Sequence, residues 1–244
     1  MLELVEKTIE KVKQTNLQHI AIIMDGNRRW AKEKNLPSAF GHKKGVEALK
    51  NTLRACDEFG IKYLTVYAFS TENWNRKQEE VDFLMDLFAK TLHNELQEMH
   101  EQNLIINFIG DLEKLNPKLQ IILKNAVEVT KNNTGVNFQI AFNYGSRLEI
   151  LNAVQNIAKL VEKGELNPSQ ITEQTIAKNL YTKGIPDPDM LIRTSGEQRI
   201  SNYLLWQIAY SEILITEEFW PDFSKNSLAK AIDEYHSRQR RFGK

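Results

Sequence analysis

The segment HIAIIMDGNRRW, residues 19–30, decides the fold class. Its first part, residues 19–25, is a short run of β-forming residues, and its second part opens into a helical pattern. The run is apolar on both faces of an extended chain, which is typical of a strand in a parallel sheet covered on both sides by helices, because neither face of such a strand meets water.

Five further β-rich runs follow along the chain, at residues 63–69, 104–110, 136–143, 190–193 and 212–216. Helical patterns lie between them, and those at 46–56 and 81–99 place their apolar residues on one face. Strands that alternate with helices, with no linker or repeat, predict an α/β fold with a mostly parallel central sheet flanked by helices. We expect an amphipathic helix over residues 1–18 and a single domain over residues 19–244.

Composition narrows the class of protein. The 244 residues contain 32 Lys and Arg against 32 Asp and Glu, so nothing attracts the chain as a whole to nucleic acid, and an anion site must be a local cluster of cations. A single cysteine excludes an internal disulfide framework and fits a reducing compartment. No apolar run approaches the ~20 residues needed to cross a bilayer, and residues 1–18 do not resemble a signal peptide. We expect a cytoplasmic protein.

The loop after the first strand combines one carboxylate with two guanidinium groups, in Asp25-Gly26-Asn27-Arg28-Arg29. Gly26 would let backbone amides approach an anion, and the arginines would bind phosphate oxygens. Asp25 fits this set if it holds Mg²⁺, which is commonly bound by one or two carboxylates together with substrate phosphates. The alternative is an ordinary turn with a capping Asp and two solvated arginines.

Two later loops have similar contents. Residues 70–76 supply Ser, Asn and Arg as anion donors and Trp74 as an apolar wall, although a helix cap and a core tryptophan would explain them as well. Residues 193–202 place Arg193 and Arg199 six positions apart around small residues, as a phosphate site would. Glu212 is either a second metal ligand or an ordinary strand-edge carboxylate, and His42, in Gly-His-Lys-Lys-Gly, could contact phosphate.

Several familiar motifs are missing from the sequence. It has no G-x-x-x-x-G-K-[ST] or G-x-G-x-x-G motif, no G-x-S-x-G and no H-E-x-x-H. The residues alone therefore indicate a magnesium-assisted site for a diphosphate-like anion, with long apolar helices nearby, and they do not name the substrate.

Seven blocks of the sequence resemble the cis-prenyltransferase family: residues 19–31, 41–45, 64–76, 142–147, 191–212, 220–223 and 238–243. They are spread over nearly the whole chain, in the order of the family. The resemblance implies a Mg²⁺-dependent transferase that condenses isopentenyl diphosphate units onto farnesyl diphosphate with cis geometry. It further implies that the product is a long-chain polyprenyl diphosphate, undecaprenyl diphosphate, the precursor of the lipid carrier for cell-wall sugars.

The resemblance also assigns roles to residues. Asp25 and Asn73 would be catalytic, and Asp25 would share Mg²⁺ with Glu212. Arg241 and Gly243 would belong to a tail that reaches the site of a partner subunit, which implies a homodimer. Substrate binding would fall to Gly26, Asn27, Arg28, Arg29, Trp30, Ser38, His42, Ser70, Thr71, Glu72, Trp74, Arg76, Arg193, Arg199, Ile200, Ser201, Arg241 and Gly243.

Three positions depart from the family pattern: Arg28 stands where many members have Gly, Ser38 where an Arg is frequent, and Gln198 where some have His. Arg28 could supply the cation that Ser38 lacks. The helices at 46–56 and 81–99 would form an apolar tunnel against the sheet, although such stripes are more often plain core. A peripheral contact with the inner face of the plasma membrane would serve product release. The alternatives are a non-catalytic partner subunit of the same fold and a synthase of shorter or longer chains.

Overall fold

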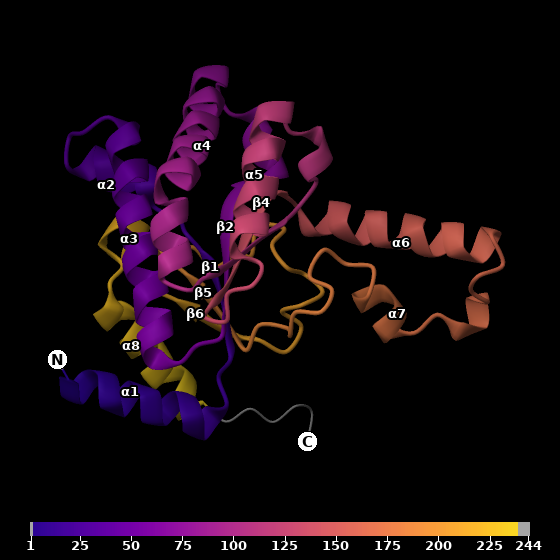
Figure 1. Ribbon diagram of the computed structural model, residues 1–244. Coiled ribbons are helices and arrows are strands. Elements are labelled where there is room, and N and C mark those ends of the chain that lie inside the picture. Colours follow the sequence, from indigo (N-terminus) through magenta and orange to yellow (C-terminus); the bar gives the residue numbers. More distant parts are fainter. Residues whose placement is uncertain (1, 239–244) are drawn as a thin grey trace.

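A six-stranded parallel sheet forms the centre of the computed structural model, which describes residues 2–238 (Figure 1). The strand order is β3-β4-β2-β1-β5-β6, and every pair of neighbours is parallel. The strands are β1 His19–Ile23, β2 Tyr63–Ser70, β3 Ile105–Ile109, β4 Asn137–Tyr144, β5 Met190–Arg193 and β6 Glu212–Ile215. All six predicted strands are present with ends shifted by at most two residues, which confirms the predicted α/β fold.

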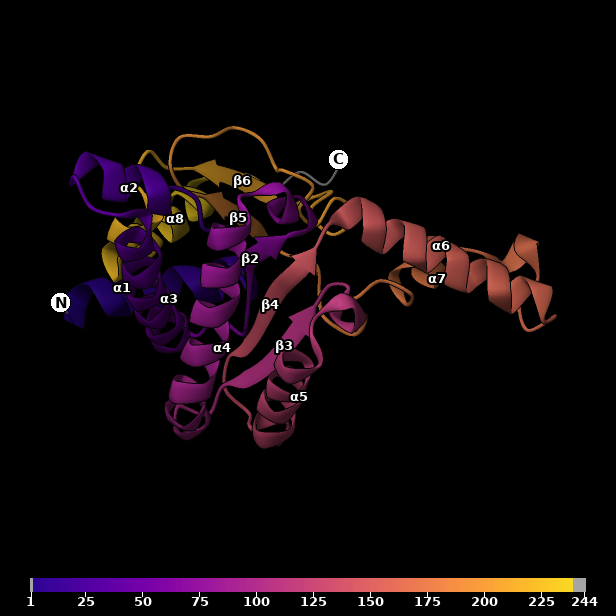
Figure 2. The same ribbon diagram turned by 90° about the horizontal axis from the view of Figure 1, so that it is seen from above.

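One face of the sheet carries the larger core. Helices α3, α4, α5 and α8 cover it, and α3 and α4 are the two helices predicted from the apolar stripes (Figure 2). The α-helices are α1 Leu2–Thr15, α2 Asn27–Glu33, α3 Ser38–Phe59, α4 Gln78–Glu101, α5 Pro117–Thr130, α6 Ser146–Glu162, α7 Glu173–Ala177 and α8 Lys225–Ser237. Cys56 on α3 is fully buried in this core.

The opposite face differs in detail from the expectation of a helical cover. Its smaller core contains Tyr144, Tyr203 and Leu204, and the irregular segment 200–208 covers the strands there. Ser201, Asn202 and Leu204 have positive φ angles, a backbone conformation that no α-helix contains. Helices α6 and α7 extend away from the sheet (Figures 1 and 2).

Helix α1 packs on the outside of the helical layer, against α8 and α3. Val12 is buried there, and Lys11 Nζ lies 2.6 Å from the Asp233 carboxylate on α8. Within the segment predicted as an amphipathic helix, residues 1–18, the structure has the docked helix α1 over Leu2–Thr15. Within residues 2–238, no helix combines the length and the apolar character that crossing a bilayer requires.

The topology locates a crevice at the carboxyl ends of β1 and β5. These strands are neighbours, but the chain leaves β1 toward β2 and leaves β5 toward β6 on the other side. Loops that diverge from adjacent parallel strands leave room between them, which is where open α/β sheets bind ligands. The loops beginning at Met24 and Thr194 border this crevice.

Candidate active site

An ion pair joins the two loops at the crevice. Arg193, the last residue of β5, donates from Nη2 to Asp25 Oδ2 at 2.7 Å, and only 4% of its side chain is exposed. Arg29 Nη2 lies 3.2 Å from Asp25 Oδ1, which also accepts a hydrogen bond from the Gly26 amide at 2.7 Å. The sequence-predicted carboxylate and arginines of two distant loops therefore meet.

Asp25 is ionised in this setting. Partial burial favours the protonated acid, but the hydrogen bond from Arg193 and the charges of Arg193 and Arg29 outweigh it and hold the pKa of Asp25 below its usual value. Thr194 fixes the backbone beside it, since its hydroxyl accepts from the Asp25 amide at 2.9 Å and donates to the Asp25 carbonyl at 2.7 Å. A charged, rigidly held carboxylate thus stands among cations.

Gly26 is required where it stands. Its φ of 105° is in the region that favours glycine, and a Cβ there would lie 2.7 Å from Phe219 Cδ1 and 3.0 Å from Ser195 Oγ. The glycine lets the loop turn directly from Asp25 into α2.

Two further carboxylates each hold a pair of arginines. Glu197 accepts from Arg29 Nη1 at 2.7 Å and also pairs with Arg199. Glu80, in the first turns of α4, lies 2.9 Å from Arg76 Nη1 and 3.6 Å from Arg28 Nη1. Arg28, the departure from the family pattern, therefore faces α4 across the crevice and adds a cation to the site.

Two polar cavities surround Asp25. The first is walled by α2, the start of α3 and the third loop; its lining includes Asp25, Gly26, Asn27, Arg28, Arg29, Ser38, His42, Arg76, Glu197 and Arg199. The second lies between the three loops; its lining includes Asp25, Asn27, His42, Ser70, Glu72, Asn73, Arg76, Arg193, Arg199, Ser201 and Asn202. Fourteen predicted site residues border one or both cavities.

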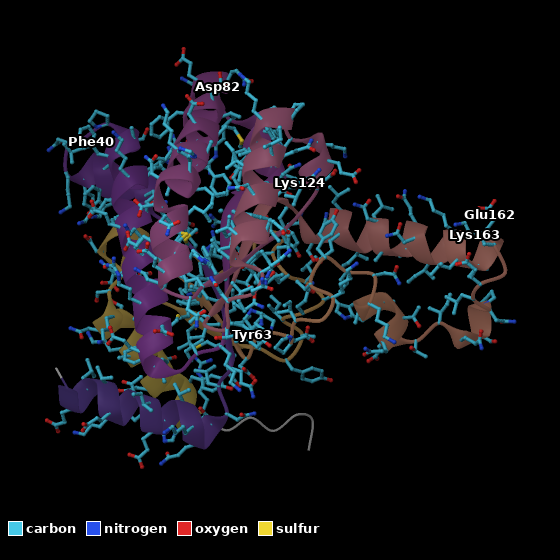
Figure 3. All side chains as sticks on the ribbon, in the orientation of Figure 1. Phe40, Tyr63, Asp82, Lys124, Glu162 and Lys163 are labelled. Carbon is cyan, nitrogen blue, oxygen red and sulfur yellow. The ribbon has the colours of Figure 1, made fainter. Side chains whose placement is uncertain are left out.

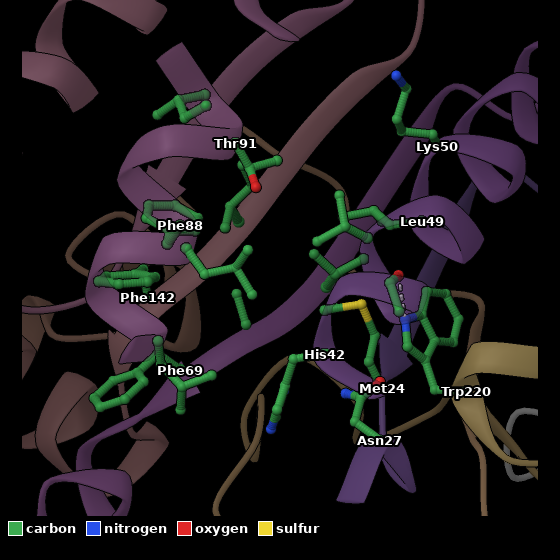
Figure 4. Close-up of a pocket in the computed structure, with 18 of the residues that line it drawn as sticks. Met24, Asn27, His42, Leu49, Lys50, Phe69, Phe88, Thr91, Phe142 and Trp220 are labelled. Atoms are coloured by element: carbon green, nitrogen blue, oxygen red, sulfur yellow. Dashed lines mark hydrogen bonds between the residues drawn. The ribbon is translucent and has the colours of Figure 1, made fainter. Parts of the chain in front are cut away.

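A third, mostly apolar cavity lies between the sheet and helices α3 and α4 (Figure 4). Its walls include Leu49 and Phe88 from the two helices and Phe142 from β4. Met24, Asn27 and His42 border this cavity as well as both polar cavities, so the three spaces adjoin at these residues. An apolar space therefore begins where the cationic site ends.

His42 stands at this junction as a neutral side chain. Its burial and the neighbouring Arg76 lower its pKa to about 4. Within residues 2–238, the buried His42 Nε2, Asn27 Oδ1, Arg193 Nε and Ser195 Oγ have no hydrogen-bond partner. Buried polar atoms normally have a hydrogen-bond partner, so four unpaired polar atoms around one crevice indicate a site for a polar ligand.

Asn73 is held by a local hydrogen bond in the turn η1 Thr71–Asn75, where its Oδ1 accepts from the Ser70 amide at 3.1 Å. Glu72 lies beside it and accepts from Asn202 Nδ2 at 2.8 Å. Although partial burial would raise the pKa of Glu72, this hydrogen bond and its neighbours in the turn lower it overall. The second loop is thus tied to the third.

Some predicted substrate-binding residues border neither polar cavity. Trp30 is buried and donates to Asp222 Oδ1 at 2.8 Å, so it packs α2 onto the domain. Trp74 donates to Asn143 Oδ1 at 2.7 Å, Thr71 lies against Gly145, and Ile200 packs in the smaller core. Arg241 and Gly243 lie outside the described residues.

Glu212 does not meet Asp25 within one chain. It is the first residue of β6 and is in register with Met190 and Ile20, near the amino ends of their strands. Asp25 follows the opposite end of β1, more than about 10 Å farther along the sheet at 3.3 Å per residue. Glu212 Oε2 is instead bound by Arg238 Nη1 at 3.0 Å.

Sequence reasoning missed several residues of the site. Glu197, Thr194 and Asn202 all lie in the third loop and were passed over in favour of its arginines. Glu80 lies in the first turn of α4, where an acidic residue favours the helix start and therefore gives no signal of a site. The sequence does carry one signal for Glu197, Thr194 and Asn202, because their loop is a short segment with many polar side chains.

The fold and the site define a class of protein: a parallel α/β domain in which a cationic crevice at the carboxyl ends of the strands adjoins an apolar cavity. The family model described as "Putative undecaprenyl diphosphate synthase" matches residues 23–243. An isoprenyl transferase of Prochlorococcus marinus is 54% identical over 226 residues, which cover 93% of this chain and 85% of that protein.

Two solved structures are similar as well. The lavandulyl diphosphate synthase of Lavandula x intermedia, in complex with dimethylallyl diphosphate, superposes with a TM-score of 0.91 at 38% identity over 93% of this chain and 98% of that one. A probable undecaprenyl diphosphate synthase of Campylobacter jejuni gives 0.79 and 32%, over 93% and 99%. The chain belongs to the undecaprenyl diphosphate synthase family of cis-prenyltransferases. It is a prenyltransferase with a role in cis-prenyl chain elongation.

Proposed function

We propose that the protein adds isopentenyl diphosphate units to farnesyl diphosphate and makes undecaprenyl diphosphate. The observation that supports this most directly is the junction at Met24, Asn27 and His42, where two polar cavities adjoin one apolar cavity. Two diphosphates and one hydrocarbon chain need that arrangement.

The first cavity would hold the allylic diphosphate. Arg28 and Arg29 would bind its oxygens and stabilise the charge that develops as the C–O bond breaks and diphosphate leaves with the electron pair. The hydrocarbon would lie in the apolar cavity, between Leu49 of α3 and Phe88 of α4. Those walls would keep water away from the allylic carbon, so that water does not attack it in place of the condensing unit.

The second cavity would hold isopentenyl diphosphate on Arg193, Arg199 and Ser201. Its double bond attacks the allylic carbon and a new C–C bond forms. The condensing unit then loses one proton to an oxygen of the released diphosphate. Asn73 borders this cavity and cannot itself act as a base at neutral pH, because an amide is not basic. Its role is to orient the condensing unit during loss of the proton.

Asp25 fits a magnesium ion. Its carboxylate is ionised and borders both polar cavities, so phosphate oxygens and waters could complete the coordination, as is common for this ion. Within residues 2–238 no three His, Cys, Asp or Glu side chains gather to hold a metal on their own. Bound there, the ion would neutralise charge on the departing diphosphate.

Glu212 can share that ion only from a second chain, because it lies far from Asp25 in its own. The proposed homodimer, in which Arg241 and Gly243 reach the partner's site, would supply such a chain. Cytoplasmic location and a peripheral membrane contact belong to the same proposal. The non-catalytic alternative loses support because Asp25 and Asn73 are both present and both border the crevice.

Incubation of the purified protein with labelled isopentenyl diphosphate, farnesyl diphosphate and Mg²⁺ tests the proposal, with chromatography of the dephosphorylated lipids. We expect one dominant long-chain product and none with EDTA. A product of one or two added units would instead identify a short-chain synthase, and no incorporation would support a non-catalytic subunit. Asp25→Ala serves as the inactive control.

A further inference from the structure

The connection between α2 and α3 projects from one corner of the molecule (Figures 1 and 2). Residues 32–44, here called the hairpin tip, contain four lysines and one glutamate, a local charge of +3 in a chain whose net charge is zero. All five of these charged side chains are exposed. This protruding segment therefore carries a local excess of positive charge.

Two large apolar side chains are exposed on the same segment. Phe40 is 52% exposed and Leu36 is 39% exposed, and Figure 3 shows Phe40 at the outer edge of the molecule. The backbone around them is fixed, because the Leu36 amide donates to the Ala31 carbonyl at 2.8 Å and the Phe40 amide to the Pro37 carbonyl at 3.0 Å. The tip thus presents an aromatic ring and lysines from a rigid support.

The hairpin tip also forms a wall of the first polar cavity. Lys32, Asn35, Leu36 and Ser38 line that cavity together with Asp25. A surface that received Phe40 would therefore lie against the opening of the site. The product of the proposed function is an amphiphile with a diphosphate head group and a long hydrocarbon chain, which resides where lipid meets water.

We propose that the hairpin tip seats the protein on a bilayer that contains anionic phospholipid, with Phe40 inserted among the head groups and the lysines on lipid phosphates. This inference rests on the proposed function for its purpose, but the binding itself needs no substrate. An aromatic side chain flanked by lysines combines the two signals that reversible membrane attachment uses, apolar insertion and attraction to anionic lipid. Because the net charge of the whole chain is zero, the attraction would depend on this local cluster of lysines.

A second exposed apolar residue provides a matched comparison. Ile121 on α5 is 66% exposed and lies between Lys118 and Lys124, so it also combines an apolar side chain with cations. It lines none of the three cavities of the site. If exposure and nearby cations were sufficient for membrane binding, replacing Ile121 would weaken that binding at least as much as replacing Phe40.

The test is co-sedimentation with vesicles of equal parts phosphatidylglycerol and phosphatidylcholine, and with phosphatidylcholine alone. We expect wild-type protein to bind the anionic vesicles, more weakly at high salt because exposed charges are screened. Phe40→Ser should lower the partition coefficient at least fivefold because the inserted ring is lost. Lys43→Glu should lower it at least tenfold because a cation near the anionic surface is replaced by an anion. Ile121→Ser should stay within about twofold of wild type, a change expected for a surface position outside the contact.

Tryptophan placed at the same two positions reports depth. Emission from Phe40→Trp should gain a component that brominated phospholipid quenches, and Ile121→Trp should not. Inorganic diphosphate, which would fill the cationic crevice, should leave vesicle binding unchanged. Release of the protein by inorganic diphosphate would show that the crevice was binding lipid phosphate, and it would overturn the proposal.

Absent binding to anionic vesicles, or an equal loss in Ile121→Ser, would also overturn it. The proposed function is measured separately, by incorporation of isopentenyl diphosphate in detergent micelles, where all three serine and glutamate variants should match wild type. An inactive wild type that still shows the Phe40-dependent binding would refute the proposed function alone. A wild-type protein that is active but does not bind the anionic vesicles would refute the proposed membrane contact alone.

Discussion

Replacing Asp25 by Asn removes one negative charge and almost no volume. Its partner Arg193 is 4% exposed and would lose a hydrogen bond between charged groups, which contributes on the order of 1.5 to 3 kcal/mol. Asp25 keeps 28% of its side chain exposed, so solvent screening favours the lower half of that range, about 2 kcal/mol. For a chain of this size that corresponds to a fall in Tm of roughly 4 to 8 °C.

The pH dependence of this difference follows from the lowered pKa of Asp25. A carboxyl whose pKa is lower in the folded protein contributes stability above its unfolded pKa of about 3.9 and loses it as pH falls through the folded value. The gap in Tm between wild type and Asp25→Asn should therefore be constant near neutral pH and shrink below about pH 4.

Calorimetry and steady-state kinetics test the reasoning together. We expect kcat to fall by about 10² to 10³, and inorganic diphosphate in EDTA to bind at least as tightly as to wild type, because Arg193 is released from Asp25. Asp233→Asn, which breaks the exposed pair with Lys11, is the control and should change neither Tm nor kcat measurably. An unchanged Tm, or retention of most activity, would refute the coupling of Asp25 and Arg193.

Three further outcomes are expected. Arg199→Ala should raise the KM for isopentenyl diphosphate about tenfold with little change in kcat, because one charge-assisted contact is lost. Arg193→Ala should also lower kcat, because Arg193 holds Asp25. Equal losses of kcat in the two variants, measured by steady-state kinetics, would contradict this assignment. Glu197→Gln should tighten binding of inorganic diphosphate, measured by titration calorimetry, since Arg29 and Arg199 lose a competing anion; weaker binding would count against it. His42 should titrate near pH 4 by NMR, so that stability falls as pH drops from about 6.5 through 4, and a midpoint near 6.5 would be inconsistent with its burial.

The sheet could be predicted from sequence because its strands are buried on both faces. β1, with the sequence HIAII, is buried at every position, and a strand with no solvent-facing side has no reason to alternate polar and apolar residues. The same logic predicted the candidate site, because polar residues at the carboxyl ends of such strands, or just after them, collect at one edge of the sheet. Asp25, Arg193 and Ser70 were found in this way.

Pairings across the site could not be predicted. Glu197 bridges Arg29 and Arg199, and Glu80 lies near Arg28. Both arrangements depend on how helices α2 and α4 pack on the domain, and no local sequence pattern predicts that packing. Trp74 was expected as a wall of the site, yet its indole is used to reach Asn143. Glu212 was a candidate second metal ligand because it follows shortly after the third loop, and the family resemblance pairs it with Asp25. The register of β6 separates the two residues within one chain.

The distribution of charge in the crevice explains how its arginines can be held by carboxylates in the free protein and still be available to bind a diphosphate. Five arginines are paired with three carboxylates, so the cluster keeps a surplus of positive charge toward an anion; the pairs are Asp25 with Arg193 and Arg29, Glu197 with Arg29 and Arg199, and Glu80 with Arg28 and Arg76. The exposed arginines gain little from a carboxylate that water already screens, and a diphosphate with several charges would displace it. Arg193 is nearly buried and would be costly to leave unpaired, which keeps Asp25 in place while its neighbours exchange.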